Sequence, residues 1–245
     1  MNNPLVSIIT PSYNQAQFLE QTILSVINQT YKNIEYFVMD GGSTDGSLEI
    51  IKKYDSKITY WQCQADLGQA DAINQAFEKC KGEIVCFINS DDILMPNAVQ
   101  TAVTCFEINS GIAMVHGNCS TIDEYGNEIR PKIGNPVKFK EVLNIGMLPH
   151  IYQPSCFFNV SQLNRNYFLD TSFHYAFDYE LILHILKNCT SLYINIHMAA
   201  YRVHAKAKSQ NVNEAFREKL RVQWMYMNGI NLKWIWRKIK TIIKK

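Results

Sequence analysis

The first 117 residues alternate short apolar segments of strand length with segments in which apolar residues recur at helical spacing. The predicted strands lie at residues 5–10, 34–39, 58–63, 84–88 and 111–116, and the predicted helices lie near residues 19–27, 47–54, 69–79 and 96–106. Strands that are joined by single helices run parallel, and nearly continuous apolar strands are covered on both faces. The pattern therefore predicts an α/β fold with a mostly parallel central sheet flanked by helices.

Polar residues and glycines cluster at the carboxyl ends of four of these strands. They form segments at residues 10–14, 40–42, 66–68 and 89–92. In open parallel sheets, ligands bind beyond the carboxyl ends of the strands. The sequence therefore predicts one shared ligand site at this edge.

Two aspartates, Asp91 and Asp92, closely follow a buried strand. Carboxylates there can hold a divalent cation that bridges a diphosphate. The alternative is that one aspartate caps the next helix while the other is solvated. The position beside three other polar strand ends favours the functional interpretation.

Other polar residues near these ends have equally concrete structural alternatives. Asp40 could accept hydrogen bonds from a nucleobase or ribose, or it could stabilise the turn that follows it. Tyr13 could stack on a base or pack at the rim of the site. Asp71 and Asn74, three residues apart on one predicted helix face, could bind a sugar or diphosphate, or merely cap the helix.

The second half is less regular. We predict a hairpin turn at residues 125–128, strands at 153–160 and 192–203, and helices at 178–188 and 214–228. Asp178 and Glu180 begin an otherwise apolar helix, where a partly buried carboxylate can act as a general base. From this segment alone, favourable placement of acids at a helix start is the better explanation.

Composition excludes several classes of protein. With 47% apolar and 19% charged residues over 245 positions, the chain has enough material for one large core. It contains no Gly-x-Ser-x-Gly, no Gly-x-Gly-x-x-Gly after the first strand and no Lys-rich phosphate loop, which disfavours hydrolases, dehydrogenases and P-loop proteins.

No apolar run approaches the roughly 18 residues of a membrane span, and the start lacks signal-peptide features. The seven cysteines, an odd number, agree with reduced thiols and a cytoplasmic location.

The last sixteen residues, 230–245, hold six basic side chains and no acidic one, whereas the rest of the chain is net acidic. At 100° per residue, most of their apolar side chains fall in one arc and the basic ones in the opposite arc, with Trp234 as the large exception. This predicts a basic amphipathic helix that lies on an anionic membrane surface. Docking of the helix on the body of the protein is the alternative.

Taken together, the motifs resemble those of the family 2 glycosyltransferases, which are inverting enzymes with the GT-A fold. The matching segments are VSIITPSYN at 6–14, DGGSTDG at 40–46, DLGQADAIN at 66–74, FINSDD at 87–92, QPSCFF at 153–158, FDYEL at 177–181 and YRVH at 201–204. The resemblance covers about residues 4–210. Each motif alone is weak evidence, but the order and spacing of the motifs together are specific to the family.

The resemblance implies roles for individual residues. Those expected to bind the donor are Thr10, Pro11, Ser12, Tyr13, Asp40, Asp66, Gly68, Asp71, Asn74, Asn89, Ser90 and Asp91. Asp91 is expected to ligate Mg²⁺ or Mn²⁺, with His204 nearby, and Asp178 aligns with the catalytic base. Asn89 departs from the commoner first aspartate of the family's Asp-x-Asp motif.

The resemblance also implies an organisation and an activity. We expect a glycosyltransferase domain at residues 1–210, with a Rossmann-like nucleotide-sugar half at 1–117, an acceptor half at 118–210 and a helical tail at 211–245. The expected reaction is inverting transfer from a nucleotide-sugar, with UDP favoured, to a carbohydrate hydroxyl during bacterial O-antigen, capsule or exopolysaccharide synthesis. The basic tail and the mildly acidic body predict, in addition, an enzyme that is peripheral on the inner face of the cytoplasmic membrane and does not bind nucleic acid.

Two other functions stay open at this point. A sugar nucleotidyltransferase shares the sheet type, but it needs a basic, glycine-rich phosphate loop that residues 10–14 lack. A non-catalytic scaffold at the membrane surface is a second alternative, which the presence of Asp40, Asp91 and Asp178 disfavours.

Overall fold

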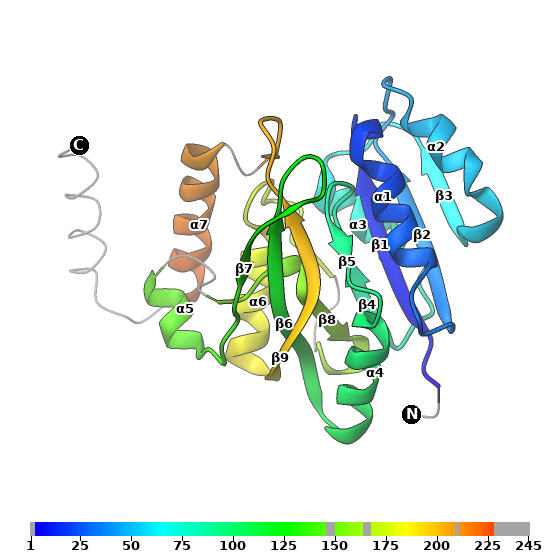
Figure 1. The fold of residues 1–245 in the computed structure, drawn as a ribbon. Helices are drawn as coiled ribbons and strands as arrows, with labels where there is room; N and C mark the ends of the chain where they lie inside the picture. Colours follow the sequence, from blue (N-terminus) through cyan, green and yellow to red (C-terminus); the bar gives the residue numbers. More distant parts are fainter. Residues whose placement is uncertain (1–2, 146–149, 164–167, 209–210, 228–245) are drawn as a thin grey trace.

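The computed structural model of the protein describes residues 3–145, 150–163, 168–208 and 211–227. A nine-stranded sheet forms the middle layer, with helices on both faces (Figure 1). Hydrogen-bonded strands follow the order β3-β2-β1-β4-β8-β6-β9-β5, and β7 pairs with β6 off this path. Within these residues, no helix has the length and apolar character that crossing a membrane requires.

The amino-terminal half forms a fully parallel unit in which β2 pairs with β1 and β3, and β1 pairs with β4. Its elements are β1 (Val6–Ser12), α1 (Ala16–Ile27), β2 (Ile34–Asp40), α2 (Ser47–Lys53), the 3₁₀ turn η1 (Asp55–Lys57), β3 (Tyr60–Cys63), α3 (Gln69–Phe77) and β4 (Ile84–Phe87). The register aligns Ser12 with Asp40 and Asp40 with Cys63. The carboxyl ends of these strands therefore share one edge, as predicted.

The second half extends the sheet with both orientations. Its elements are β5 (Ile93–Leu94), α4 (Ala98–Ile108), β6 (Ile112–Ile122), β7 (Glu128–Lys132), α5 (Phe139–Ile145), η2 (Gln153–Ser155), β8 (Cys156–Asn159), η3 (Val160–Gln162), α6 (Phe177–Asn188), β9 (Thr190–Arg202) and α7 (Val212–Tyr226). β8 runs antiparallel to β4 and β6, whereas the long strands β6 and β9 run parallel. The predicted α/β architecture is confirmed, and every antiparallel pair in the described residues involves a strand of this half.

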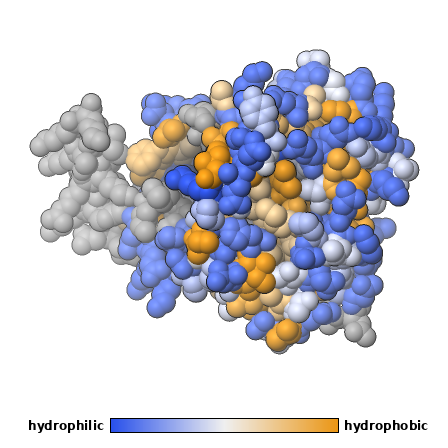
Figure 2. Space-filling view, in the orientation of Figure 1, coloured by the Kyte–Doolittle hydropathy of each residue, from blue (hydrophilic) through white to orange (hydrophobic). Residues whose placement is uncertain are grey.

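Two apolar clusters fill the two sides of the sheet. Successive residues of a strand point to opposite faces, so Phe87 joins the cluster that contains α3 and α6, whereas Cys86 joins the one that contains α1 and α4. On the face shown in Figure 2, apolar side chains occur as separate patches among polar ones.

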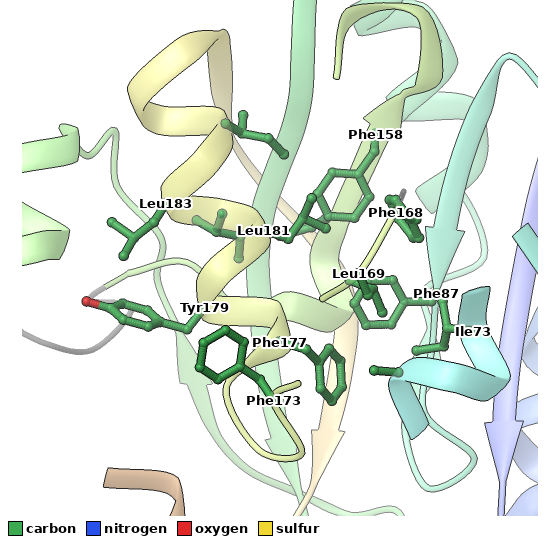
Figure 3. Close-up of a cluster of buried hydrophobic side chains, with 14 of the residues drawn as sticks. Ile73, Phe87, Phe158, Phe168, Leu169, Phe173, Phe177, Tyr179, Leu181 and Leu183 are labelled. Carbon is green, nitrogen blue, oxygen red and sulfur yellow. The ribbon is translucent and has the colours of Figure 1, made fainter. Parts of the chain in front are cut away.

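The cluster around Phe87 fixes α6 against the end of β4. The Phe87 ring lies 6.2 Å from that of Phe158, 5.9 Å from that of Phe168 and 6.2 Å from that of Phe177, between ring centroids (Figure 3). Aromatic pairs at such distances add to the stabilisation from burial alone. The first residue of α6 is therefore packed beside the strand that leads into the Asn89–Asp92 turn.

Several predicted elements differ in detail from the structure. The strand predicted at 111–116 continues to Ile122, because β6 pairs with β9 and β7 beyond that point. The strand predicted at 153–160 begins as the η2 turn, since Pro154 has no N–H for a strand ladder. The short elements β5 and α5 were not predicted. All seven cysteines are free, and the predicted amphipathic segment 230–245 lies outside the described residues.

Candidate functional site

Asp40, the last residue of β2, is almost fully buried and organises the turn that follows it. Its Oδ1 atom accepts the N–H groups of Gly42 (3.1 Å) and Ser43 (2.8 Å) and the thiol of Cys63 (3.0 Å), and Oδ2 accepts the Ser43 hydroxyl (2.6 Å). The turn-stabilising alternative is thus observed. A nucleoside contact by Asp40 stays a prediction.

The end of β1 is buried beside this turn. Thr10, Pro11 and Ser12 are all buried, and the Tyr36 hydroxyl donates to Thr10 Oγ1 at 3.0 Å. Among the described residues, Ser12 Oγ is buried without a hydrogen-bond partner. Because buried hydroxyls are normally paired, Ser12 is a good candidate for a ligand contact.

Close approaches at two glycines connect the end of β1 with the segment before α6. A β-carbon on Gly41 would lie 2.9 Å from Asp66 Oδ2 and 3.3 Å from the ring of Tyr13, which is itself 64% exposed. A β-carbon on Gly68, where φ is +112°, would lie 3.1 Å from His174 Nδ1. The predicted donor residues of three strand ends therefore form a continuous arc.

The polar side chains of α3 are already occupied within the protein. Asp71 Oδ2 accepts from the Leu67 N–H (3.1 Å) and the Gln75 amide (2.7 Å). The Asn74 amide donates to the Leu169 carbonyl (2.8 Å) and accepts the Leu169 N–H (2.9 Å). These contacts are structural, and the predicted donor contacts of Asp71 and Asn74 remain untested.

Asn89 is held by hydrogen bonds at both ends of its amide, and Ser90 beside it is buried. Gln69 Nε2 donates to Asn89 Oδ1 at 2.6 Å, and Asn89 Nδ2 donates to Asp92 Oδ2 at 3.1 Å. An aspartate at position 89 would place a carboxylate against that of Asp92. The departure from the family's commoner aspartate thus has a local physical reason.

Asp92 is fully buried and serves the structure instead of being solvated. Its Oδ1 accepts the Arg202 N–H at 2.9 Å. Burial, together with the charge of Asp91, raises the pKa of Asp92 well above its ordinary range. The Arg202 guanidinium, also fully buried, donates to the Asp91 carbonyl, the Asp123 and Glu124 carbonyls and Gln21 Oε1.

Asp91 and His204 meet at the predicted metal position. His204 Nε2 lies 3.0 Å from Asp91 Oδ2, and the His204 and Asp91 side chains are only 5% and 17% exposed, respectively. Carboxylate oxygens suit Mn²⁺ and Mg²⁺, and imidazole is a common metal ligand. Mg²⁺ is commonly held by one or two carboxylates plus substrate phosphates. Within the described part of the chain, no group of three or more His, Cys, Asp or Glu side chains could hold a metal ion. The pair therefore fits a cation that takes its other ligands from phosphate and water.

Asp178 is the second residue of α6 and is partly buried. Burial raises the pKa of its carboxyl, while the Tyr179 N–H, 2.7 Å from Oδ1, and the charges of Lys219 and Lys208 oppose that rise. A carboxylate with this environment suits a general base.

The start of α6 is held by α7. Ala176, the residue before the helix, has no side-chain cap hydrogen bond. Instead, the Glu218 carboxylate accepts the N–H groups of His174 (3.0 Å), Tyr175 (2.6 Å) and Ala176 (3.0 Å). The described part of the region predicted as a tail therefore helps to position Asp178.

Sequence reasoning missed four residues that organise this site. They are Gln69, Arg202, Lys208 and Glu218. Gln69 lies within the 66–74 motif, and Arg202 ends an apolar strand two residues before His204, so both carried a signal. Glu218 and Lys208 carried none, because only the tertiary fold brings them to the site.

The chain is similar in sequence to known glycosyltransferases. The sequence profile of the family Glycosyl transferase family 2 matches residues 7–168. An uncharacterised glycosyltransferase of Haemophilus influenzae is 38% identical over 133 residues, which are 53% of each chain. Chondroitin synthase of Escherichia coli is 30% identical over 182 residues, 74% of this chain and 26% of that protein. The chain thus spans about half of the first of these relatives and about a quarter of the second.

Solved structures share the fold at low sequence identity. Residues 1–349 of S. aureus TarS in complex with UDP-GlcNAc give a TM-score of 0.72 at 18% identity, covering 93% of this chain and 68% of that one. A Pyrobaculum calidifontis mannosyltransferase in complex with GDP-Man and Mn²⁺ gives 0.64 at 18% identity, covering 89% and 64%. These similarities confirm the predicted GT-A type of fold.

Replacing Glu218 by alanine should destabilise the protein and loosen the start of α6. Three N–H groups lose a charged acceptor, and hydrogen bonds to charged groups contribute about 1.5–3 kcal/mol. Urea unfolding measures the loss, and amide hydrogen exchange at residues 174–176 should become faster. Glu214→Ala is the matched control, because its ion pair with Arg217 is exposed and should matter by less than about 1 kcal/mol. Equal stability of the two variants would contradict the capping role.

Proposed function

Because the chain belongs to glycosyl transferase family 2, we propose that it transfers one sugar from a nucleotide-sugar donor to a hydroxyl group of a carbohydrate acceptor. The observation that carries this proposal is the Asp91–His204 contact at one edge of the sheet, with the Asp178 helix packed beside the same strand end through Phe87 and Phe177. The proposed leaving-group site at Asp91 and the proposed base, Asp178, are thus carried by elements that contact each other. A donor panel scored by release of UDP or GDP tests the proposal directly.

A UDP-sugar is the proposed donor, and a GDP-sugar is the second candidate. Of the two solved structures described above, that of TarS is in complex with UDP-GlcNAc and that of the mannosyltransferase is in complex with GDP-Man. The proposed donor-binding residues are the arc from Ser12 and Tyr13 through Asp40 and Asp66 to Gly68, together with the 89–91 turn.

The proposed cofactor is Mg²⁺ or Mn²⁺, held by Asp91 and His204. When bound, the cation would offset negative charge on the diphosphate. Asp92 and Arg202 would keep the Asp91 backbone in place, because both are buried and hydrogen-bonded there.

The proposed reaction is a single displacement with inversion. The acceptor hydroxyl oxygen bonds to the anomeric carbon while the bond from that carbon to the diphosphate oxygen breaks, and its electron pair leaves with the nucleotide. The Asp178 carboxylate takes the hydroxyl proton. Since the base must be ionised, its raised pKa requires the rate to rise with pH above the ordinary carboxyl range.

The proposed biological role is bacterial surface polysaccharide synthesis on the cytoplasmic side of the membrane. Two of the similar proteins, the chondroitin synthase of Escherichia coli and TarS of S. aureus, are bacterial, and chondroitin is a polysaccharide. If the protein were a sugar nucleotidyltransferase, it would be active with a sugar phosphate. If it were a non-catalytic scaffold, it would bind no nucleotide.

Asp178→Asn should lower turnover by at least 100-fold, because general-base catalysis contributes about 10²–10⁴-fold. Donor affinity should change little, since the amide has nearly the same shape. Steady-state rates and calorimetry measure the two effects, with Asp170→Asn, seven residues before α6, as a control. Full turnover by Asp178→Asn would remove the base assignment.

Asp91→Asn should weaken the Mn²⁺-dependent affinity for UDP by at least about tenfold, because the amide is a poorer ligand for a hard cation. Calorimetry with Mn²⁺ and with EDTA separates the metal-dependent part. Asp55→Asn is the control, because Asp55 precedes β3 and so lies at the amino ends of the strands, away from the site. Unchanged UDP affinity in Mn²⁺ would contradict the metal role, and no UDP or GDP binding by the wild type would favour a scaffold.

The membrane contact proposed for residues 230–245 predicts binding to anionic vesicles. Full-length protein should sediment with phosphatidylglycerol-containing liposomes and lose this at high salt, because surface charges are screened. Neither a chain ending at residue 229 nor a full-length chain with the six basic residues changed to glutamine should sediment. Equal sedimentation of all three proteins would end the membrane proposal.

A further inference from the structure

One lysine beside the site residues is surrounded by an amide and two aromatic rings. Lys208 lies between β9 and α7, four residues after His204. Its ammonium donates to Gln69 Oε1 at 3.0 Å. Within the described ranges, no carboxylate lies close enough to form an ion pair with it, and its Nζ lies 5.3 Å from the ring centroids of both Tyr175 and Phe177. An ammonium has three donors, so two remain for another acceptor.

This arrangement disfavours the charged form while the site is empty. Lys208 is partly buried, and burial lowers its pKa to about 8, although the charges of Asp178 and Glu218 oppose that shift. A cation taken from water without a paired anion costs free energy. An anionic ligand would recover this cost when it binds.

The contacts of Lys208 point to where that anion lies. Gln69 also donates to Asn89, which precedes Asp91 by two residues. Lys208 also lies close enough to Asp178 to lower its pKa, and its Nζ is 5.3 Å from the ring centroid of Phe177, the residue before Asp178. The ammonium is therefore linked through Gln69 to the turn proposed to hold the diphosphate and also lies near the proposed base, close to where the bond between sugar and diphosphate would break.

We propose that Lys208 binds a phosphate oxygen of the donor diphosphate and that Gln69 positions its ammonium for this contact. The inference rests on the proposed function and adds to it a donor-binding residue outside every motif singled out in the sequence. Lysine binds phosphate as a compact point charge. Because negative charge on the diphosphate grows as the glycosidic bond breaks, the contact should aid departure of the nucleotide as well as donor binding.

Calorimetry in Mn²⁺ with nucleoside, monophosphate and diphosphate tests the contact. The uridine and guanosine series are both measured, and the series that the wild type binds is used. Lys208→Met should lower affinity for the diphosphate by at least tenfold and leave affinity for the nucleoside unchanged. Lys208→Arg should keep most of the diphosphate affinity, and Gln69→Leu should lower it by a smaller factor. Lys206→Met, an exposed neighbour in the same segment, should match the wild type.

The pH dependence of the rate is a second test, because a residue that only stabilises the fold would not change it. The wild-type rate should fall at alkaline pH as Lys208 loses its proton, and Lys208→Arg should move this fall to higher pH, because arginine stays charged.

Three outcomes would overturn the inference. Lys208→Met could bind the diphosphate as tightly as the wild type, it could lose nucleoside and diphosphate affinity equally, or Lys208→Arg could keep the wild-type alkaline limb. The first two leave the proposed function intact if the wild type still releases nucleotide from a donor sugar. A wild type that binds no UDP or GDP and turns over no donor would remove both proposals. If Lys208→Met does not fold, Lys208→Arg and Gln69→Leu decide by the same criteria.

Discussion

The buried contact between Asp92 and Arg202 holds together the parts of the molecule that form the site. The Asp92 carboxylate accepts the Arg202 backbone N–H, and the Asp92 backbone carbonyl accepts the hydroxyl of Thr22 on α1 at 2.8 Å. The Arg202 guanidinium donates to the Asp91 carbonyl at 2.8 Å. Both side chains are fully buried, so the loss of one partner would leave polar groups unpaired in the interior. The end of β9 is therefore joined to the turn after β4, and His204 reaches Asp91 because it follows Arg202 by two residues.

A second, mainly apolar arrangement places Asp178. Packing of Phe177 on Phe87 fixes the first turn of α6 beside β4, and Glu218 of α7 satisfies the N–H groups that precede the helix. α7 is itself anchored by Val222, buried in the same cluster, and by Gln223, which donates to the Leu143 carbonyl. The acids of the site thus depend on different forces: Asp91 on buried hydrogen bonds, and Asp178 on aromatic packing plus a cap from a distant helix.

Much of the fold could be predicted from the sequence, because strand and helix periodicity are local properties. The parallel half and its polar edge follow from apolar runs that end in Ser12, Asp40 and the Asn89–Asp92 turn. The pairing of Asp91 with His204 followed from family resemblance and not from spacing, since 113 residues separate them. Lys208 and Glu218 could not be found, because their neighbours Gln69 and Tyr175 lie far away in the sequence and no local pattern encodes such contacts. The two-residue strand β5 was missed because it is too short to show a period.

Asn89 shows how a local departure from a family pattern can be required by its neighbours. Its position needs a group that accepts from the Gln69 amide and donates to the Asp92 carboxylate, and the Asn89 amide does both. An aspartate could accept but not donate unless it were protonated, and it would add a like charge beside a carboxylate whose pKa is already raised by burial and by Asp91. The amide therefore avoids adding a third carboxyl group to the turn beside Asp91 and Asp92, and the Gln69 carbonyl oxygen stays directed toward Lys208.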